Sequence, residues 1–330
     1  MSGPAPDAHR LERALSRRFG SGVSVDGLRR LSGGASRETW SFDASAADGT
    51  RHPLVLRRDP GGHTGQTARS TEYALLECAQ AHGVLVPAVE LLLTHDDDLG
   101  EGFVMRRVDG ETIARKILRD DHYANARRVL AAQCGEQAAR IHAVPSQGLP
   151  PLPNLGAEEQ IAQYRDALDT LGEPHPAFEL GLRWLADQMP EPDGGLPGLV
   201  HGDFRNGNFV IDADGMQAVL DWELAHLGDP VEDLGWLCVK SWRFGASQPV
   251  GGFGGYAELL DAYESVSGRR VELERLRYWE VFGTLKWGVM CELQASLHWS
   301  GAIRSVELAA LGRRVAEMEW DLLTTLAELG

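Results

Sequence analysis

Two short polar segments interrupt the second half of this 330-residue sequence: HGDFRNGN at residues 201–208 and LDWE at residues 220–223. Apolar residues flank both, with Leu199-Val200 before the first segment and Val219 before the second. Such flanks predict short buried strands or turns that present polar side chains at their ends. The sequence on either side carries apolar residues at helical spacing, so residues 198–222 form one strand-like block within a helical region.

Three residues of this block, Asp203, Asn208 and Asp221, have side chains suited to binding a cation. Asn208 follows Asp203 by five positions, and Asp221 lies thirteen positions beyond Asn208. Two carboxylates and a carboxamide that converge would offer hard oxygen ligands to Mg²⁺, which prefers carboxylates together with substrate phosphates. Each residue taken singly is more simply interpreted as a hydrogen-bonded loop residue. The complete pattern favours a site for a metal and a phosphate group.

The sequence after residue 107 is expected to be mostly helical, because apolar residues recur there every three or four positions. The predicted helices cover residues 123–144, 157–171, 176–188, 256–267, 273–299 and 305–329. The tryptophans of this region, which lie mostly on helical stripes, are expected to pack in the core, Trp236 among them.

The sequence up to residue 107 is expected to contain more strands than helices. An opening helix over residues 7–19 is followed by alternating apolar and polar segments that predict strands. The predicted strands cover residues 38–43, 53–57, 89–93 and 102–107, with one helix over residues 71–82 between them. Glycines 33 and 34 fall in the turn that precedes the first of these strands.

Composition and charge exclude several classes of protein. A hydrophobic content of 43% is too high for a disordered chain, and 4 cysteines without a CxxC pair are too few for a disulfide scaffold. A net charge of −16 argues against nucleic acid as a partner. Residues 108–330 carry a net charge of −15 and residues 1–107 a net charge of −1, which favours a domain boundary near residue 108.

The sequence also bears on the cellular compartment. No apolar segment of the kind found in secretory signals follows the first charged residues. The longest apolar run, residues 84–93, contains Pro87 and Glu90 and is too short to span a bilayer. We therefore expect a cytoplasmic protein with reduced thiols and without a membrane partner.

The segments HGDFRNGN and DWE together resemble the catalytic loop and the metal-binding motif of the aminoglycoside phosphotransferase/choline kinase family. That family is a branch of the protein-kinase-like fold, in which the matching pattern is H-R-D-x-x-x-x-N followed by D-F-G. The resemblance implies an α+β, bilobal fold. Residues 1–107 would form a small lobe, with an antiparallel sheet and one main helix, that binds nucleotide, and residues 108–330 a large helical lobe with the catalytic loop and the acceptor pocket.

The resemblance also assigns roles to the polar block, for a reaction that uses ATP and Mg²⁺. Asp203 would orient the acceptor hydroxyl and take its proton, while Asn208 and Asp221 would hold Mg²⁺ against the nucleotide phosphates. Arg205 lies where protein kinases often place a cation near the transferred phosphoryl group. Phosphoryl transfer needs little covalent help from the protein, so positioning and charge neutralisation are expected to dominate.

The first lobe matches the family in the same order. The turn of Ser32, Gly33, Gly34 and Ser36 resembles the phosphate-covering loop, where glycine lets the backbone approach a nucleotide. Arg57 falls on the strand that carries the phosphate anchor, and Glu72 opens the helix that supplies its ion-pair partner. Met105 ends a strand where the adenine-binding hinge is expected.

Arg57 departs from the family pattern, which has lysine at the anchor. The sequence has no lysine before Lys116, so a shift of register cannot supply one. Arginine binds phosphate bidentately but is not interchangeable with lysine. Two interpretations follow: an active enzyme with an arginine anchor, or a nucleotide-binding regulator without turnover. A third, a metal-dependent hydrolase that uses Asp203, Asp221 and His201, leaves the first lobe unexplained.

Residues near the motifs are expected to support them. Asp229 is expected to cap the following helix, Asp233 to brace the catalytic loop, and His201 to pack within that loop. Glu223 is expected to lie just outside the metal ligands. The arginines between residues 269 and 277 are expected to form a solvated face.

A narrower resemblance covers residues 221–236, 240–245 and 278–282, which look like the phosphotransferases similar to the kinase domain of some acyl-CoA dehydrogenases. It points to hydroxyacyl compounds, including CoA thioesters, as acceptors. The acidic second lobe fits a cationic amino sugar or choline-like acceptor instead. A small-molecule hydroxyl is the expected acceptor in either case, and the protein is expected to be a monomer or a homodimer.

Overall fold

A computed structural model describes residues 5–31, 38–59, 67–191 and 197–329 of the chain. The chain divides into two compact units, each described separately below. The first contains residues 1–110 together with residues 147–151 and 217–224. The second contains residues 111–146, 152–216 and 225–330. The segment around Asp221 therefore belongs to the first unit, whereas residues 201–208 belong to the second.

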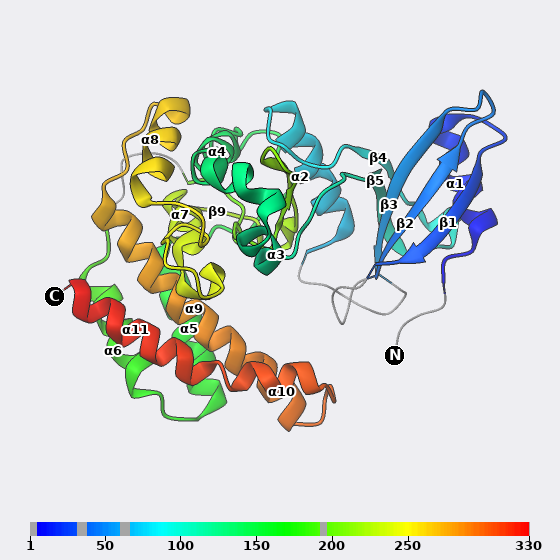
Figure 1. The fold of residues 1–330 in the computed structure, drawn as a ribbon. Helices are drawn as coiled ribbons and strands as arrows, with labels where there is room; N and C mark the ends of the chain where they lie inside the picture. Colours follow the sequence, from blue (N-terminus) through cyan, green and yellow to red (C-terminus); the bar gives the residue numbers. More distant parts are fainter. Residues whose placement is uncertain (1–4, 32–37, 60–66, 192–196, 330) are drawn as a thin grey trace. The chain divides into compact units, whose positions relative to one another are not determined.

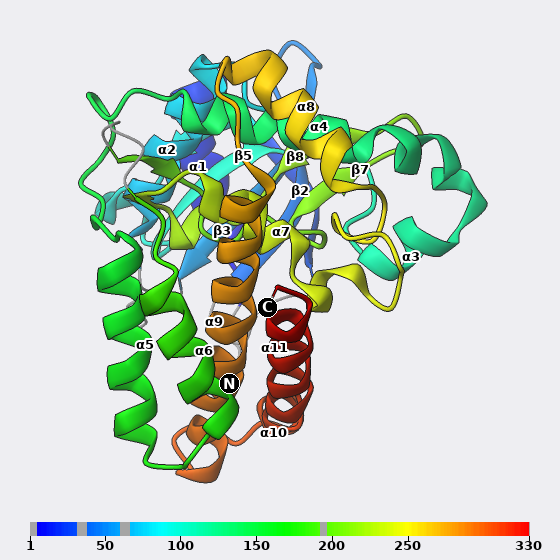
Figure 2. The ribbon, with the colours of Figure 1, turned by 90° about the vertical axis from the view of Figure 1, so that its left-hand side faces the viewer.

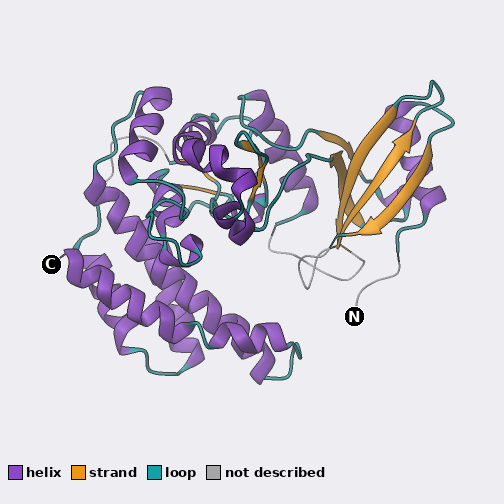
Figure 3. Cartoon of the chain, in the orientation of Figure 1, coloured by secondary structure: helices purple, strands orange, loops and turns teal. Residues whose placement is uncertain are grey.

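The first unit is built on a five-stranded antiparallel sheet with the order β1-β2-β3-β5-β4 (Figure 1; Figure 3). Its strands are β1 (Ser24–Arg30), β2 (Glu38–Ser45), β3 (Arg51–Asp59), β4 (Val89–Leu92) and β5 (Glu101–Arg106). The sequence predicted all of these except β1. That strand has only exposed and half-buried residues, so it lacks the apolar alternation by which the others were found.

Two α-helices accompany this sheet: α1 (Ala8–Phe19) and α2 (Arg69–Ala81). Asp7 caps α1, because its carboxylate accepts a hydrogen bond from the Arg10 N–H at 3.0 Å. The buried face of α1 joins one apolar cluster with the strands, to which Leu11, Phe42 and Leu56 belong. Both helices were predicted; α2 begins two residues earlier than expected.

The second unit is mostly helical (Figure 2). Its α-helices are α3 (Ala114–Arg119), α4 (Ala124–His142), α5 (Ala157–Leu171), α6 (Pro176–Asp187), α7 (Val231–Cys238), α8 (Tyr256–Ser267), α9 (Leu273–Trp299), α10 (Val306–Gly312) and α11 (Val315–Leu329). The long helix α9 packs against α5, α6, α7, α10 and α11, and α4 packs against α8. Helix α9 is therefore the central element of this unit.

The single helix expected over residues 305–329 is wrong. The structure has α10 and α11 there, separated by Arg313 and Arg314. The N–H groups of these two arginines bond carbonyls only three residues back, at 3.2 and 2.8 Å, which tightens and ends the α-helical ladder. A side chain at Gly312 would come within 2.9 Å of the Ala295 side chain, so α10 lies close against α9 where the break occurs.

Short strands frame the polar block. Strands β6 (Gly198–Val200) and β9 (His226–Gly228) pair antiparallel in the second unit, and residues 201–208 follow β6 directly. Further short elements are β7 (Phe209–Ile211), β8 (Met216–Val219), and the 3₁₀ helices η3 (Trp222–Leu224) and η4 (Lys240–Arg243). Across the described ranges, no helix has the length and apolar character needed to cross a bilayer.

Candidate active site

The loop after β6 holds Asp203 by three hydrogen bonds to its carboxylate. Arg205 Nε and Trp236 Nε1 each donate to Oδ1 at 2.9 Å, and Asn208 Nδ2 donates to Oδ2 at 2.6 Å. Gly202, at φ 80°, makes the sharp turn that leads from β6 to Asp203. Asp203, Arg205 and Asn208 were predicted as a group, and the structure brings their side chains together.

Asn208 and Arg205 each have a second interaction. Asn208 Nδ2 also donates to the Asp203 main-chain carbonyl at 3.0 Å, so its amide nitrogen faces Asp203, and the amide oxygen is its remaining group for a cation. The Arg205 guanidinium lies over the Trp242 ring at 4.4 Å from the centroid, a cation–π distance. Arg205 is therefore held between an anion and an aromatic face.

Asp233 of α7 braces the backbone of the loop, as predicted. Its carboxylate accepts hydrogen bonds from the N–H groups of His201 at 2.7 Å and Gly202 at 2.9 Å. His142 Nε2 donates to the same carboxylate at 3.1 Å. Burial raises the pKa of Asp233, but the bond and charge of His142 and the charge of His201 outweigh it, so that pKa is lowered.

His201 packs within the loop, as expected. It is fully buried, and its Nδ1 accepts a hydrogen bond from the Asp203 N–H at 3.2 Å. Its ring lies edge-on to Phe204. A ring nitrogen that already accepts from the backbone is poorly placed to bind a metal, so the structure does not favour the hydrolase interpretation.

A buried charge pair lies beneath the loop. Lys286 of α9 donates to Glu232 of α7 at 3.0 Å and to the Gly202 carbonyl at 3.2 Å. Glu232 also accepts from His226 at 3.1 Å and from Gln160 at 2.6 Å. Burial opposes the charge of Glu232, but Lys286 and His226 hold its pKa at about 2. The sequence did not indicate this pair, because Glu232 and Lys286 lie 54 positions apart in the chain.

Arg57 of β3 lies in a cluster of carboxylates in the first unit. It pairs with Glu72 of α2 at 2.8 Å and with Asp221 at 2.7 Å. Burial lowers the pKa of Arg57, but the Glu72 and Asp221 charges outweigh it and raise that pKa. Asp221 has φ 69°, a left-handed conformation that is uncommon for a residue other than glycine. The predicted pairing of Arg57 with Glu72 is present, and Asp221 joins it.

Arg69 belongs to the same cluster, and the sequence did not indicate it. Its guanidinium donates to Glu72 at 2.5 Å and to Asp59 at 2.7 Å, and its side chain is 1% exposed. Glu72 is thus shared by two arginines. An arginine in the first turn of a helix is usually interpreted as a surface residue, so no sequence signal marked this one.

The remaining residues predicted for nucleotide binding are only partly described. Met105 lies on β5, 7% exposed, opposite Val55 of β3 and Val89 of β4. Ser32, Gly33, Gly34 and Ser36 lie outside the described residues. Their assignment to the phosphate-covering turn stays a prediction.

Asp229 and the arginines between residues 269 and 277 differ in part from what the sequence predicted. Asp229 is not the N-cap residue of α7, which is Pro230, but its carboxylate accepts from the N–H of Val231, the first helical residue, at 3.0 Å. The same side chain binds Arg275 at 2.6 Å and Trp279 at 3.0 Å. The expectation of a solvated arginine face is wrong for two of its members, because Arg275 pairs with Asp229 and Arg277 pairs with Glu280.

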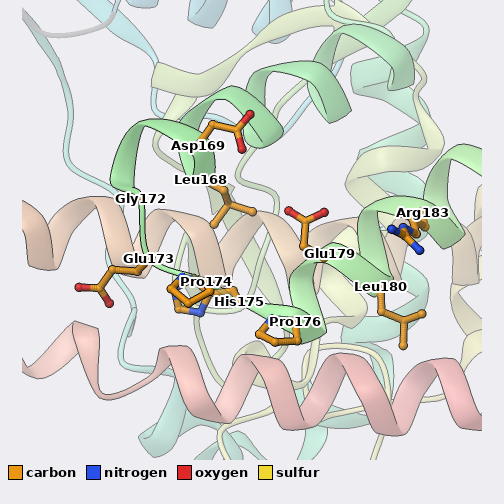
Figure 4. A pocket seen from close by; sticks show the side chains of 10 residues that line it. All are labelled: Leu168, Asp169, Gly172, Glu173, Pro174, His175, Pro176, Glu179, Leu180 and Arg183. Atoms are coloured by element: carbon orange, nitrogen blue, oxygen red, sulfur yellow. The ribbon is translucent and has the colours of Figure 1, made fainter.

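A cavity of about 650 Å³ in the second unit is not lined by the candidate residues. It lies at the turn between α5 and α6, where Asp169, Glu173 and Glu179 line it together with His175 and Arg183 (Figure 4). Glu173, His175 and Glu292 also have ligand atoms within 4.8 Å of one another. Asp203 is not among the residues that line this cavity, so the loop after β6 and the cavity are separate features.

The sequence model of the phosphotransferase enzyme family matches residues 27–274, which include both polar segments and the Arg57 strand. The chain belongs to this phosphotransferase enzyme family. The match confirms that the chain belongs to the predicted class of enzyme, the phosphotransferases.

Curated relatives of this phosphotransferase are acyl-CoA dehydrogenase family members. Mouse acyl-CoA dehydrogenase family member 10 is 29% identical over 199 residues, which are 56% of this chain and 18% of that protein. The chain spans less than a third of the length of the curated relatives that it matches first. The similarity agrees with the narrower resemblance seen in the sequence.

Solved structures show the same fold. A protein from Ralstonia eutropha, assigned by name to the aminoglycoside phosphotransferases, has a TM-score of 0.78 at 21% identity, over 98% of this chain and 99% of that one. A choline/ethanolamine kinase family protein from Mesorhizobium loti has a TM-score of 0.62 at 19% identity, over 97% of each chain. A ternary complex of an aminoglycoside phosphotransferase, APH(4)-Ia, with AMP-PNP and hygromycin B has a TM-score of 0.58 at 18% identity, over 95% of this chain and 99% of that one. The predicted α+β kinase-like fold is confirmed.

Proposed function

We propose that this phosphotransferase transfers the γ-phosphoryl group of ATP to a hydroxyl group of a small molecule, with Mg²⁺ as cofactor. The observation that carries the proposal is the carboxylate of Asp203, which Arg205, Trp236 and Asn208 hold in one orientation. A carboxylate fixed in this way can accept the proton of an acceptor hydroxyl, and phosphoryl transfer depends mainly on such positioning.

Arg205 supports transfer in a second way. Its side chain is 24% exposed while Nε binds Asp203, so Arg205 is not sealed in the core. A guanidinium beside the base is suited to neutralise charge on the transferred phosphoryl group. Stacking on Trp242 holds the guanidinium plane in place.

The predicted magnesium ligands fit the ion by their chemistry. Asn208 turns its amide nitrogen to Asp203 and keeps an amide oxygen for a cation. Asp221 offers a carboxylate whose side chain is 39% exposed although it contacts Arg57. Both are hard oxygen donors, which Mg²⁺ prefers. When bound, the ion would neutralise charge on the nucleotide phosphates.

Arg57 is the proposed phosphate anchor in place of lysine. Glu72 fixes one arm of its guanidinium, as the ion-pair partner of the family's lysine is expected to do. The other arm binds Asp221, a proposed metal ligand, and this contact favours the alternative function: a nucleotide-binding regulator without turnover. Asp203 and its three donors favour the active enzyme.

The acceptor class is proposed from the relatives and from the charge. The curated relatives are named acyl-CoA dehydrogenase family members, which supports a hydroxyacyl compound or its CoA thioester. An amino sugar or another antibiotic is the second candidate, because residues 108–330 carry a net charge of −15. Neither nucleic acid nor a membrane is proposed as a partner, and the protein is proposed to act as a monomer or a homodimer.

The test is a transfer assay with γ-labelled ATP and Mg²⁺ against a panel of hydroxyacyl compounds, CoA thioesters and amino sugars. The active-enzyme proposal expects labelled product that disappears in the Asp203→Asn variant and after removal of Mg²⁺. Nucleotide that raises the melting temperature without any transfer would favour the regulator instead. Neither binding nor transfer would contradict both.

A further inference from the structure

The sequence assigned Asp203, Arg205 and Asn208 to the catalytic loop, but the third donor to Asp203 comes from elsewhere. Trp236 lies on α7, 33 residues after Asp203, and its indole Nε1 donates to Asp203 Oδ1 at 2.9 Å. Its side chain is buried, with 2% exposed. A tryptophan on the stripe of a helix is expected to serve the core only, and this one also reaches the proposed base.

The Trp236 ring packs against Lys286, Trp242 and helix α9. The Lys286 ammonium lies 4.8 Å from the ring centroid, and Trp242 packs against the ring at 5.2 Å. Helix α9 lies close by, because a side chain at Gly283 would come within 3.0 Å of Trp236 Cε3. A donor that cannot move holds its acceptor more firmly than a flexible one, since no side-chain entropy is lost when the bond forms.

Helix α7 therefore holds the catalytic loop through three residues that lie within about one helical turn. Glu232 fixes Lys286, which in turn donates to the Gly202 carbonyl. Asp233 accepts from the N–H groups of His201 and Gly202. Trp236 donates to the side chain of Asp203, the loop residue after Gly202. The first two fix the backbone, and only Trp236 fixes the carboxylate itself.

The other two donors are less suited to this task. Arg205 and Asn208 both belong to the loop that they would have to stabilise, and Arg205 is 24% exposed. A proposed phosphoryl-binding cation and a proposed metal ligand each have a second partner during the reaction. Trp236, by contrast, is proposed neither as a phosphoryl-binding cation nor as a metal ligand, and its N–H donates to Asp203.

We propose that Trp236 is a positioning residue for the proposed phosphoryl transfer: its indole N–H fixes the rotamer of the Asp203 carboxylate. This inference rests on the proposed function. It makes no claim that Trp236 touches a substrate. Its loss should slow the chemical step and leave nucleotide binding unchanged, because the donor acts only through Asp203.

The kinetic test compares Trp236→Phe with Trp287→Phe. Trp287 belongs to the same aromatic cluster, packing against Trp242 at 5.0 Å, and in the described part of the chain its buried Nε1 has no hydrogen-bond partner. The two variants remove the same group from one cluster. A hydrogen bond to a charged group contributes about 1.5–3 kcal/mol, so Trp236→Phe should lower kcat about 10- to 100-fold with KM for ATP unchanged. Trp287→Phe should leave both constants within about twofold. Equal effects of the two variants, or a loss confined to KM, would overturn the inference.

A spectroscopic test does not depend on turnover. The indole N–H resonance of Trp236 in the ¹⁵N-labelled wild-type protein is identified by its disappearance in Trp236→Phe. In Asp203→Ala it should move upfield, toward the position of an unbonded indole, while the Trp287 resonance stays in place. A Trp236 resonance that does not move in Asp203→Ala would contradict the inference, even if the wild-type enzyme is active. A wild-type protein without transfer activity would reject the proposed function, and the resonance would still decide whether the bond exists.

Discussion

The surroundings of Asp203 and of Arg57 differ in how their charges are balanced. Asp203, in the second unit, accepts one bond from a cation and two from neutral donors. Arg57, in the first unit, faces two carboxylates and shares one of them with Arg69. Neutral donors orient a carboxylate without adding charge, whereas a buried network of full charges is stable only while each member is present. A substitution at the first site should mainly affect chemistry, and one at the second should mainly affect stability.

The largest effect is expected at Asp203, where the comparison predicts lost activity in a stable protein. Asp203→Asn keeps the shape of the side chain and an oxygen for Trp236 and Arg205. It removes the proton acceptor, so kcat should fall about 10²- to 10⁴-fold. The free energy of unfolding, measured in urea, should change by no more than about 1 kcal/mol. A variant that unfolds would contradict the comparison, because Asp203 would then carry the structure.

The reverse is expected at Arg69, which is buried between Asp59 and Glu72. Arg69→Met leaves two carboxylates without their shared cation, and breaking a buried pair costs about 3–5 kcal/mol. The loss should appear as a lower urea midpoint by circular dichroism. Arg51→Met is the matched control: Arg51 pairs with Asp43 but is 69% exposed, so its loss should cost at most about 1 kcal/mol. Similar losses of unfolding free energy in the two variants would show that the burial of an ion pair does not determine how much its removal destabilises the protein.

The ion pair of Glu232 and Lys286 refines the comparison, because it is a pair of full charges close to Asp203. Lys286 donates to Glu232 and to the carbonyl of Gly202, the residue before Asp203. The pKa of Glu232 is lowered from 4.5 to about 2 in the folded protein. A lowered pKa contributes stability that is complete above pH 4.5 and is lost as the pH falls toward 2. The wild-type protein should therefore exceed Glu232→Gln in free energy of unfolding most at neutral pH, and the difference should shrink below pH 4.5. Urea titrations over this pH range test it; a constant difference would speak against the charge pair.

The smallest effect is expected for Arg57→Lys, which restores the residue of the family pattern. A lysine ammonium lacks the planar fork with which Arg57 binds Glu72 and Asp221 together. We expect a loss of about 1 kcal/mol in stability, the contribution of one hydrogen-bonded contact. Thermal unfolding of the variant checks this. An increase in the melting temperature would contradict this, because it would show that lysine stabilises the carboxylates of Glu72 and Asp221 more than arginine does.

Sequence reasoning succeeded where the relevant residues are close in the chain. The helices α5, α8 and α9 were predicted with their observed ends, because apolar residues recur at a constant helical period. Asp203, Arg205 and Asn208 were grouped correctly because they lie within one loop. The Arg57–Glu72 pair was found through the family pattern and not through spacing.

Sequence reasoning failed where a contact joins distant segments or where burial is hidden. Trp236 and Lys286 reach the loop from helices that follow it by tens of residues, and both residue types have simpler interpretations. Arg69 is charged and yet 1% exposed, which composition cannot reveal. Strand β1 has no buried residue, so its sequence lacks an apolar period.

The close approach of α7 and α9 has a mechanical consequence. A side chain at Gly235 would collide with the backbone of α9, 2.5 Å from the carbonyl carbon of Trp279, so the two helices touch through their main chains. Helix α9 is 27 residues long, about 40 Å, and ends at the exposed Trp299. It packs directly against α7, the helix that carries Trp236. Because main-chain atoms of α7 and α9 are in contact, a shift of one helix requires a shift of the other, and Trp236 moves with α7.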